Sequence, residues 1–200
     1  MSADTGDTAA DAGAAAAAGA ADAAGAADAK RPRVDAAAEP AAAAPIVIFW
    51  KPGGPHGWLS NWSAHPIVDG GVTFKTAEHA FMYHKALAMG DAAAAAKVLK
   101  AKTPYAAKQV GRSIKPWDEA KWVREREGVM LGVLRKKVAQ HPQLAAMLRA
   151  SAPHVLAEAS PFDAVWGIGC GPSAATASDP ARWRGLNLLG KLWMRVRDEL

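Results

Sequence analysis

The pattern of apolar and polar positions predicts a few short strands among longer helices. Short runs rich in β-branched and aromatic residues, such as I-V-I-F-W at 46–50, are typical of buried strands. Stretches with apolar residues at every third or fourth position are typical of amphipathic helices. The predicted elements are a strand at 46–50, a hairpin at 67–74, a strand at 154–158, and helices starting at Thr76 or spanning 91–101, 104–111, 117–140, 142 onward and 186–200. They lack the regular strand–helix alternation of a doubly wound fold, so we expect the α+β class with a mainly helical single domain.

Composition divides the chain near residue 45. Residues 1–44 are mostly Ala with scattered Gly and Asp, and they contain almost no bulky apolar side chains. Such a segment buries too little apolar surface to offset its ordering entropy, so we expect disorder there. All eight Trp, all four Phe and both Tyr lie beyond it. The sequence therefore predicts a disordered tail at 1–44 and one folded domain at 45–200.

Charge and cysteine content indicate which partners and which cellular compartment to expect. Residues 45–200 carry 21 Lys and Arg against 12 Asp and Glu, a surplus that suits phosphorylated metabolites or nucleic acid, or simply a well-solvated surface. Cys170 is the single cysteine, which suits a reducing compartment. No apolar run approaches the ~20 residues of a membrane span, and no secretory leader is evident. We expect a cytoplasmic or nuclear protein, with the basic K-R-P-R at 30–33 as a candidate nuclear address.

The helix starting at Thr76 places two reactive side chains on one stripe. Glu78 and Lys85 are seven positions apart and so lie within about 20° of each other around the helix axis, with Met82 beside them. A carboxylate and an amine on a partly apolar stripe are candidates for chemistry. The alternative is that Glu78 complements the helix dipole and that Lys85 is a solvated lysine.

Histidines do not form a metal-binding pattern in this sequence. His79 and His84 are five positions apart on a helix and point to different faces, and the other histidines are scattered. We therefore expect no metal and interpret both as packing or hydrogen-bonding residues. A nucleophile elbow and a P-loop lysine motif are also missing, which argues against serine hydrolase and nucleoside triphosphate chemistry.

A second dense segment, D-A-V-W-G-I-G-C-G at 163–171, adds another acid and a flat aromatic side chain. Its glycines allow the backbone to approach a ligand, and Trp166 can stack on a base or sugar. A helical turn capped by Ser160, followed by a Gly-rich loop, is the structural alternative. Two acids, a lysine and several tryptophans suit cleavage at an anomeric carbon, whose oxocarbenium-like transition state needs a nearby carboxylate. A lysine would assist electrostatically or form a Schiff base.

Short motifs in a fixed order resemble the NADAR (YbiA-like) family. They are L-S-N-W at 59–62, F-K-T-A-E-H at 74–79 running into Lys85, G-R at 111–112, the helix 122–130, D-A-V-W-G at 163–167, and G-L-N-L-L-G at 185–190 running into Met194 and Arg197. The resemblance implies an α+β fold of the YbiA-like type and N-glycosidase activity without a cofactor. One branch of the family acts on phosphorylated ribosylamino-pyrimidine intermediates of riboflavin synthesis, and another removes ADP-ribose from guanine.

Site residues follow from the resemblance by position. The implied catalytic residues are Glu78, Lys85 and Asp163, and the implied substrate-binding residues are Asn61, Arg112, Trp122, Trp166, Gly167 and Asn187. One departure is an insertion at 170–184 relative to simple bacterial members, which we expect to cap the pocket.

The predicted function is removal of ADP-ribose from ADP-ribosylated guanine, with the riboflavin intermediates as the alternative substrate class. The predicted partners are an ADP-ribosylated or phosphoribosyl small molecule, or nucleic acid bearing the modified base, and no stable protein partner is inferred. A non-catalytic reader of ADP-ribose and a plain nucleic-acid-binding module are alternatives from other classes. Glu78 argues against a reader, because a reader has little need of a carboxylate facing the anomeric carbon.

Overall fold

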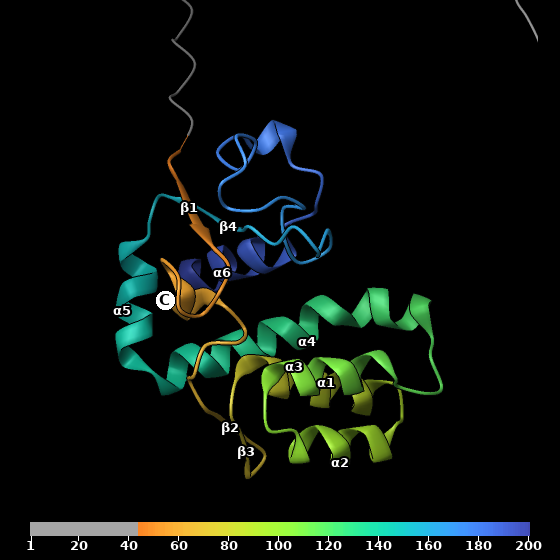
Figure 1. The fold of residues 1–200 in the computed structure, drawn as a ribbon. Helices are drawn as coiled ribbons and strands as arrows, with labels where there is room; N and C mark the ends of the chain where they lie inside the picture. Colours follow the sequence, from red (N-terminus) through yellow and green to blue (C-terminus); the bar gives the residue numbers. More distant parts are fainter. Residues whose placement is uncertain (1–43) are drawn as a thin grey trace, which may run out of the picture. The chain divides into compact units, whose positions relative to one another are not determined.

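The computed structural model describes residues 44–200. The tail predicted to be disordered, residues 1–44, lies outside the described residues except for residue 44. The basic cluster at 30–33 also lies outside them. The described part of the chain holds six α-helices and four short strands, which confirms the mainly helical α+β architecture (Figure 1). None of its helices combines the length and the apolar character that crossing a bilayer requires.

The four strands form two separate pairs. Strand β1 (Ile46–Phe49) pairs in parallel with β4 (Val155–Glu158), with Ile46 opposite Val155 and Phe49 opposite Glu158. Strands β2 (Ile67–Asp69) and β3 (Val72–Phe74) form the predicted antiparallel hairpin. Gly70 and Gly71 at its tip have φ of 57° and 78°, the left-handed values that a tight hairpin turn needs.

The helices match the periodicity of the sequence, and side-chain caps define several of their ends. Thr76 caps α1 by accepting a hydrogen bond from the His79 amide, and Thr103 caps α3 ahead of Pro104. The helices are α1 (Ala77–Ala88), α2 (Ala92–Lys100), α3 (Pro104–Arg112), α4 (Glu119–Gln140), α5 (Pro142–Ala150) and α6 (Leu188–Asp198). The predicted helix starting at 186 begins two residues later in the structure, at Leu188.

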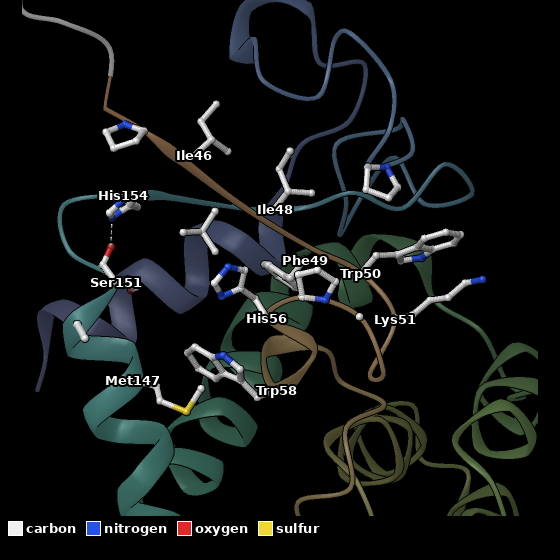
Figure 2. Close-up of a pocket in the computed structure, with 16 residues that line it drawn as sticks. Ile46, Ile48, Phe49, Trp50, Lys51, His56, Trp58, Met147, Ser151 and His154 are labelled. Atoms are coloured by element: carbon white, nitrogen blue, oxygen red, sulfur yellow. Dashed lines mark hydrogen bonds between the residues drawn. The ribbon is translucent and has the colours of Figure 1, made fainter.

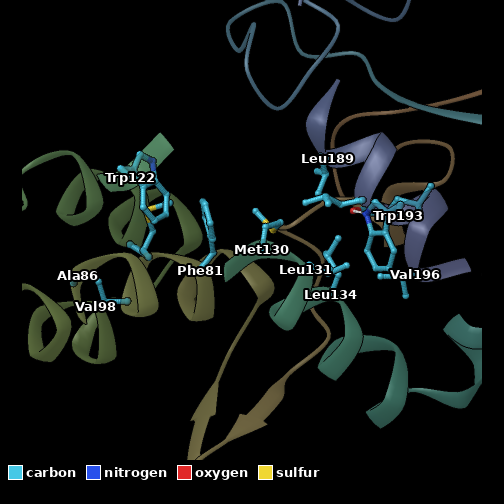
Figure 3. Close-up of a cluster of buried hydrophobic side chains, with 14 of the residues drawn as sticks. Phe81, Ala86, Val98, Trp122, Met130, Leu131, Leu134, Leu189, Trp193 and Val196 are labelled. Atoms are coloured by element: carbon cyan, nitrogen blue, oxygen red, sulfur yellow. Dashed lines mark hydrogen bonds between the residues drawn. The ribbon is translucent and has the colours of Figure 1, made fainter. Parts of the chain in front are cut away.

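Helix α4 joins two groups of elements into one core. Helices α1 to α3 lie on one side of it, and α6 with the β1–β4 pair lies on the other (Figure 1). Figure 3 shows the apolar cluster continuing from Phe81 and Trp122 past Met130 and Leu134 on α4 to Trp193 on α6. The buried Trp193 indole donates a 2.9 Å hydrogen bond to the Leu59 carbonyl, which fixes the loop that precedes β2.

The insertion at 170–184 packs away from the predicted site, so the expectation that it caps the pocket is wrong. Its apolar residues Cys170, Ala177 and Trp183 pack with Ile46 and Ile48 of β1. The amides of residues 184 and 185 both bond to the Ile168 carbonyl and close the base of the loop. The loop has apolar side chains of its own to bury, and the face of the β1–β4 pair offers them a surface.

Candidate active site

Two cavities in the described part of the chain are large enough to hold a small ligand. The larger, about 1020 Å³, lies beside β1 and is lined mainly by apolar side chains of β1, by Trp58 and by residues of α5 (Figure 2). Its lining includes His56, His154 and Lys51 but no carboxylate. It therefore lacks the acid that chemistry at a glycosidic carbon requires.

The second cavity, about 670 Å³, gathers most of the predicted site residues. It lies between α1, the end of α3, the first half of α4 and the segment after β4. The predicted residues on its wall are Asn61, Glu78, Lys85, Arg112, Trp122, Asp163 and Trp166. Motifs more than 100 positions apart in the chain thus share one cavity.

Glu78 enters the cavity from the first turn of α1. Its backbone amide donates a 2.9 Å hydrogen bond to the Asn61 carbonyl, and its side chain is buried, with the residue 5% exposed. Burial raises the pKa of Glu78 to about 7; Lys108 opposes the rise and Asp163 adds to it. A carboxyl group with a pKa near neutrality can exchange protons with a substrate at physiological pH.

Lys85 reaches the same cavity two turns further along α1, as the predicted stripe requires. Its Nζ donates a 2.9 Å hydrogen bond to the Gly111 carbonyl. The ammonium also lies 4.5 Å from the ring centre of Trp117 and 5.3 Å from that of Trp122. Desolvation by burial lowers the pKa of Lys85, which favours a larger fraction of neutral, nucleophilic amine.

Aromatic rings form a continuous wall around these two groups. The Phe81 ring lies 5.5 Å from Trp122 and 5.1 Å from Trp166, and it meets Trp166 edge-on at 83°. A second aromatic contact, between Trp50 and Phe162, lies at the rim, where Phe162 is 89% exposed. These flat faces suit a ligand that carries a base.

Asp163 is a hydrogen-bond acceptor in the lining of the cavity. Its Oδ1 accepts from the amides of Val165 and Trp166 at 3.0 and 2.8 Å, and its Oδ2 lies 3.9 Å from Lys108 Nζ. This turn replaces the capped helical turn that Ser160 could have started. It also fixes the backbone of Trp166 beside Phe81.

Several polar atoms on this wall are buried without a hydrogen-bonding partner. Five such side-chain atoms occur among the described residues, and three of them belong to this cavity: Asn61 Oδ1, Arg126 Nε and Glu158 Oε2. Buried polar groups are normally paired, because leaving one unpaired costs about 1–3 kcal/mol. One acceptor, one cationic donor and one carboxyl oxygen of residues that line the cavity are thus left without a partner.

Gly167 and Asn187, both predicted to bind substrate, are not among the residues that line the cavity. A Cβ on Gly167 would come within 2.8 Å of the Glu158 carbonyl oxygen, so this glycine serves the chain's own close packing. Asn187 is 1% exposed; its Oδ1 accepts from the Glu158 amide at 3.1 Å and its Nδ2 donates to the Leu156 carbonyl at 2.9 Å. It adopts φ 52° and extends the hydrogen bonding of β4.

Sequence reasoning missed several residues of the wall. Glu158 is the final residue of β4, and Lys108 and Arg126 project from α3 and α4. The one available indication for Glu158 was a carboxylate that ends an apolar strand five residues before Asp163. Lys108 and Arg126 had no local indication, since each is one of several basic residues on a helix.

The two histidines of α1 are hydrogen-bonded, as predicted. His79 Nδ1 lies 2.8 Å from Thr76 Oγ1, and His84 Nε2 lies 2.9 Å from Asp69 Oδ2. Between residues 44 and 200, no three His, Cys, Asp or Glu side chains come together as metal ligands.

The chain is similar in sequence and fold to several known proteins. The NADAR domain model matches residues 48–200. The N-glycosidase YbiA of Escherichia coli (strain K12) is 33% identical over 155 residues, covering 78% of this chain and 88% of YbiA. The NMR structure of E. coli YbiA superposes with a TM-score of 0.64 at 32% identity, over 78% of this chain and 84% of that one.

Two further relatives are longer than the matched region. Protein irg-1 of Caenorhabditis elegans is 35% identical over 131 residues, covering 64% of this chain and 62% of that protein. Riboflavin biosynthesis protein VVA0006 of Vibrio vulnificus (strain YJ016) is 31% identical over 154 residues, covering 77% of this chain and 38% of that protein. The chain thus spans less than two thirds of either relative.

Proposed function

The chain belongs to the NADAR family, and we propose that it is an N-glycosidase that hydrolyses the C–N glycosidic bond of a phosphorylated ribosyl compound. The observation that carries the proposal is the buried Glu78 carboxyl in one aromatic-walled cavity with the Lys85 amine. The name of YbiA, an N-glycosidase, supports the same reaction class.

Each group has a role in this reaction. Glu78 stabilises the developing positive charge at the anomeric carbon or activates the attacking water. Lys85 contacts the ribose or attacks the anomeric carbon to give a Schiff base. Trp122 and Trp166 stack on the base or the ribose, and Asp163 accepts a hydrogen bond from a substrate hydroxyl or from the leaving group.

The cavity also has the charge to hold phosphate groups. Five cationic side chains line it: Lys51, Lys85, Lys108, Arg112 and Arg126. The unpaired, buried Nε of Arg126 is a donor of the kind that binds phosphate oxygens. A ligand with two phosphate groups would pair with more of these cationic side chains than a ligand with one.

ADP-ribosylated guanine is the substrate that we propose. An ADP-ribosyl group carries a diphosphate and a second base, which fits the five cations and the additional aromatic contact of Trp50 with Phe162 at the rim. The basic domain suits the same substrate, whether as a nucleotide or within nucleic acid. The loop at 170–184 lends no support, because it packs elsewhere.

Phosphorylated ribosylamino-pyrimidine intermediates of riboflavin synthesis are the second candidate. The name of the Vibrio vulnificus relative favours this substrate class. A single phosphate and a single base would occupy the inner part of the cavity and leave the rim aromatics unused.

A direct assay separates these substrates. The purified protein is incubated in parallel with an oligonucleotide carrying ADP-ribosylated guanine and with the ribosylamino-pyrimidine phosphate, and released ADP-ribose or ribose 5-phosphate is measured. Release from the first alone supports our proposal, and release from the second alone supports the alternative. Tight binding of ADP-ribose without release from either identifies a reader, and salt-dependent DNA binding alone identifies a nucleic-acid-binding module.

A further inference from the structure

Glu158 is a third carboxyl group of the cavity, and the roles described so far do not use it. It ends β4, where the parallel strand pair delivers its side chain to the cavity wall. Its Oε2 is buried and has no hydrogen-bonding partner among the described residues. An ionised carboxylate in such a place would need donors, whereas a protonated one would need only an acceptor for its single proton.

The groups that face Glu158 favour the protonated form. Burial, followed by the negative charges of Asp163 and Glu78, raises the pKa of Glu158 to about 8, and Lys108 opposes this rise. Asp163 Oδ1 accepts two backbone amides, whereas Glu158 Oε2 accepts no hydrogen bond. Three carboxyl groups in one cavity cannot all be ionised at low cost, so the proton stays on the group without donors.

Hydrogen bonds from Asn187 hold the backbone at Glu158. Asn187 accepts from the Glu158 amide at 3.1 Å and donates to the Leu156 carbonyl at 2.9 Å, so the strand end is tied to the residue that precedes α6. Because Glu158 lines the cavity, its carboxyl group is close to the space that a ligand would enter.

We propose that Glu158 is the general acid that protonates the departing base, an assignment that rests on the proposed N-glycosidase function. As the C–N bond breaks, its electron pair goes to the base, and the Glu158 proton moves to the base so that it leaves neutral. The anomeric carbon gains the oxygen of water, directly or after the Lys85 adduct, and the water proton passes to Glu78. Glu78 then releases that proton to solvent and Glu158 regains one from solvent, so the net change is the addition of one water across the bond.

The test compares two leaving groups in wild type and Glu158→Gln. The first substrate is whichever base-bearing compound wild type hydrolyses, and the second carries 4-nitrophenolate in place of the base and departs without protonation. We expect Glu158→Gln to lower single-turnover rates on the base substrate by about 10²–10⁴-fold, and to stay within about threefold of wild type on the nitrophenolate substrate. Glu127→Gln, an exposed carboxyl of α4 outside the cavity, is the matched control.

A pH profile supplies an independent readout. Activity of wild type on the base substrate should fall as pH rises through about 8, because the acid form of Glu158 is lost, and Glu158→Gln should lack this fall. Equal losses on both leaving groups, or an unchanged fall in the variant, would overturn the acid role while leaving the N-glycosidase proposal intact. If wild type releases neither base nor nitrophenolate, the proposed function fails, and this assignment fails with it.

Discussion

The backbone amide of Glu78 and the carbonyl of Asn61 are joined by a 2.9 Å hydrogen bond. This bond uses one of the free amides at the start of α1 to attach the 59–62 loop, so both residues reach the cavity from a fixed angle. Asn61 Nδ2 lies 3.6 Å from Met130 Sδ on α4, and its Oδ1 is buried without a hydrogen-bonding partner. The bond therefore ties the loop to the first turn of the helix.

Glu78→Gln should abolish turnover without unfolding the protein. The amide preserves the size of the side chain and the backbone bond to Asn61, but it can neither take up a proton nor stabilise positive charge. We expect a loss of more than about 10³-fold in the rate of base release, with an unchanged circular dichroism spectrum. Normal turnover in this variant would refute the assignment of the site.

Lys85 gives a prediction that distinguishes two mechanisms. Its lowered pKa and its position between Trp117 and Trp122 favour attack on the anomeric carbon, so borohydride should trap a covalent adduct in wild type given substrate. Lys85→Ala should give no adduct by mass spectrometry, whereas Lys102→Ala, at an exposed lysine outside the cavity, should still give one. A wild-type protein that forms no adduct would restrict Lys85 to an electrostatic role.

The raised pKa of Glu158 makes stability depend on pH in a defined direction. The carboxyl has a pKa of about 8 in the folded protein and about 4.5 when unfolded, so the folded state binds more protons between these values. Its contribution to the free energy of unfolding therefore falls as pH rises from about 4.5 to 8. Glu158→Gln should match wild type near pH 4 and exceed its melting temperature by about 5–10 °C above pH 8. Melting curves that differ by the same amount at every pH would contradict this.

Lys137 is predicted to be a structural residue that supports the site from behind. It is 0% exposed, and its Nζ donates to the Trp58 carbonyl at 2.6 Å, the Ser60 carbonyl at 3.1 Å and Ser63 Oγ at 2.7 Å. Lys137→Met keeps the volume but leaves these acceptors unpaired, so we expect a loss of about 2–4 kcal/mol in the free energy of unfolding, measured with urea.

The neighbouring lysine offers a control for this effect. Lys136 makes a 3.3 Å ion pair with Asp69, and its side chain is 42% exposed. Lys136→Met should cost less than about 1 kcal/mol, as is usual for exposed pairs. Equal effects of the two substitutions would contradict the role given to Lys137.

Local sequence patterns were sufficient for the elements and for half of the site. The helical period placed Glu78 and Lys85 on one face before any tertiary contact was known, because that angle depends only on residue spacing. Caps such as Thr76, and the glycine pair at 70–71, are likewise decided within a few residues. The sequence by itself thus determined the fold class and the reactive stripe of α1.

Only the tertiary structure decided which other groups meet that stripe. The cavity also contains Glu158, Lys108 and Arg126, which come from three different elements. Their spacing along the chain does not predict that they lie close together. The sequence also did not show that the 170–184 loop packs on the apolar surface of β1 and not over the cavity. Nor did it show that Asn187 forms its hydrogen bonds with β4. Burial then set the pKa values of Glu78 and Glu158, because desolvation depends on every atom packed around a carboxyl group and not on its neighbours in sequence.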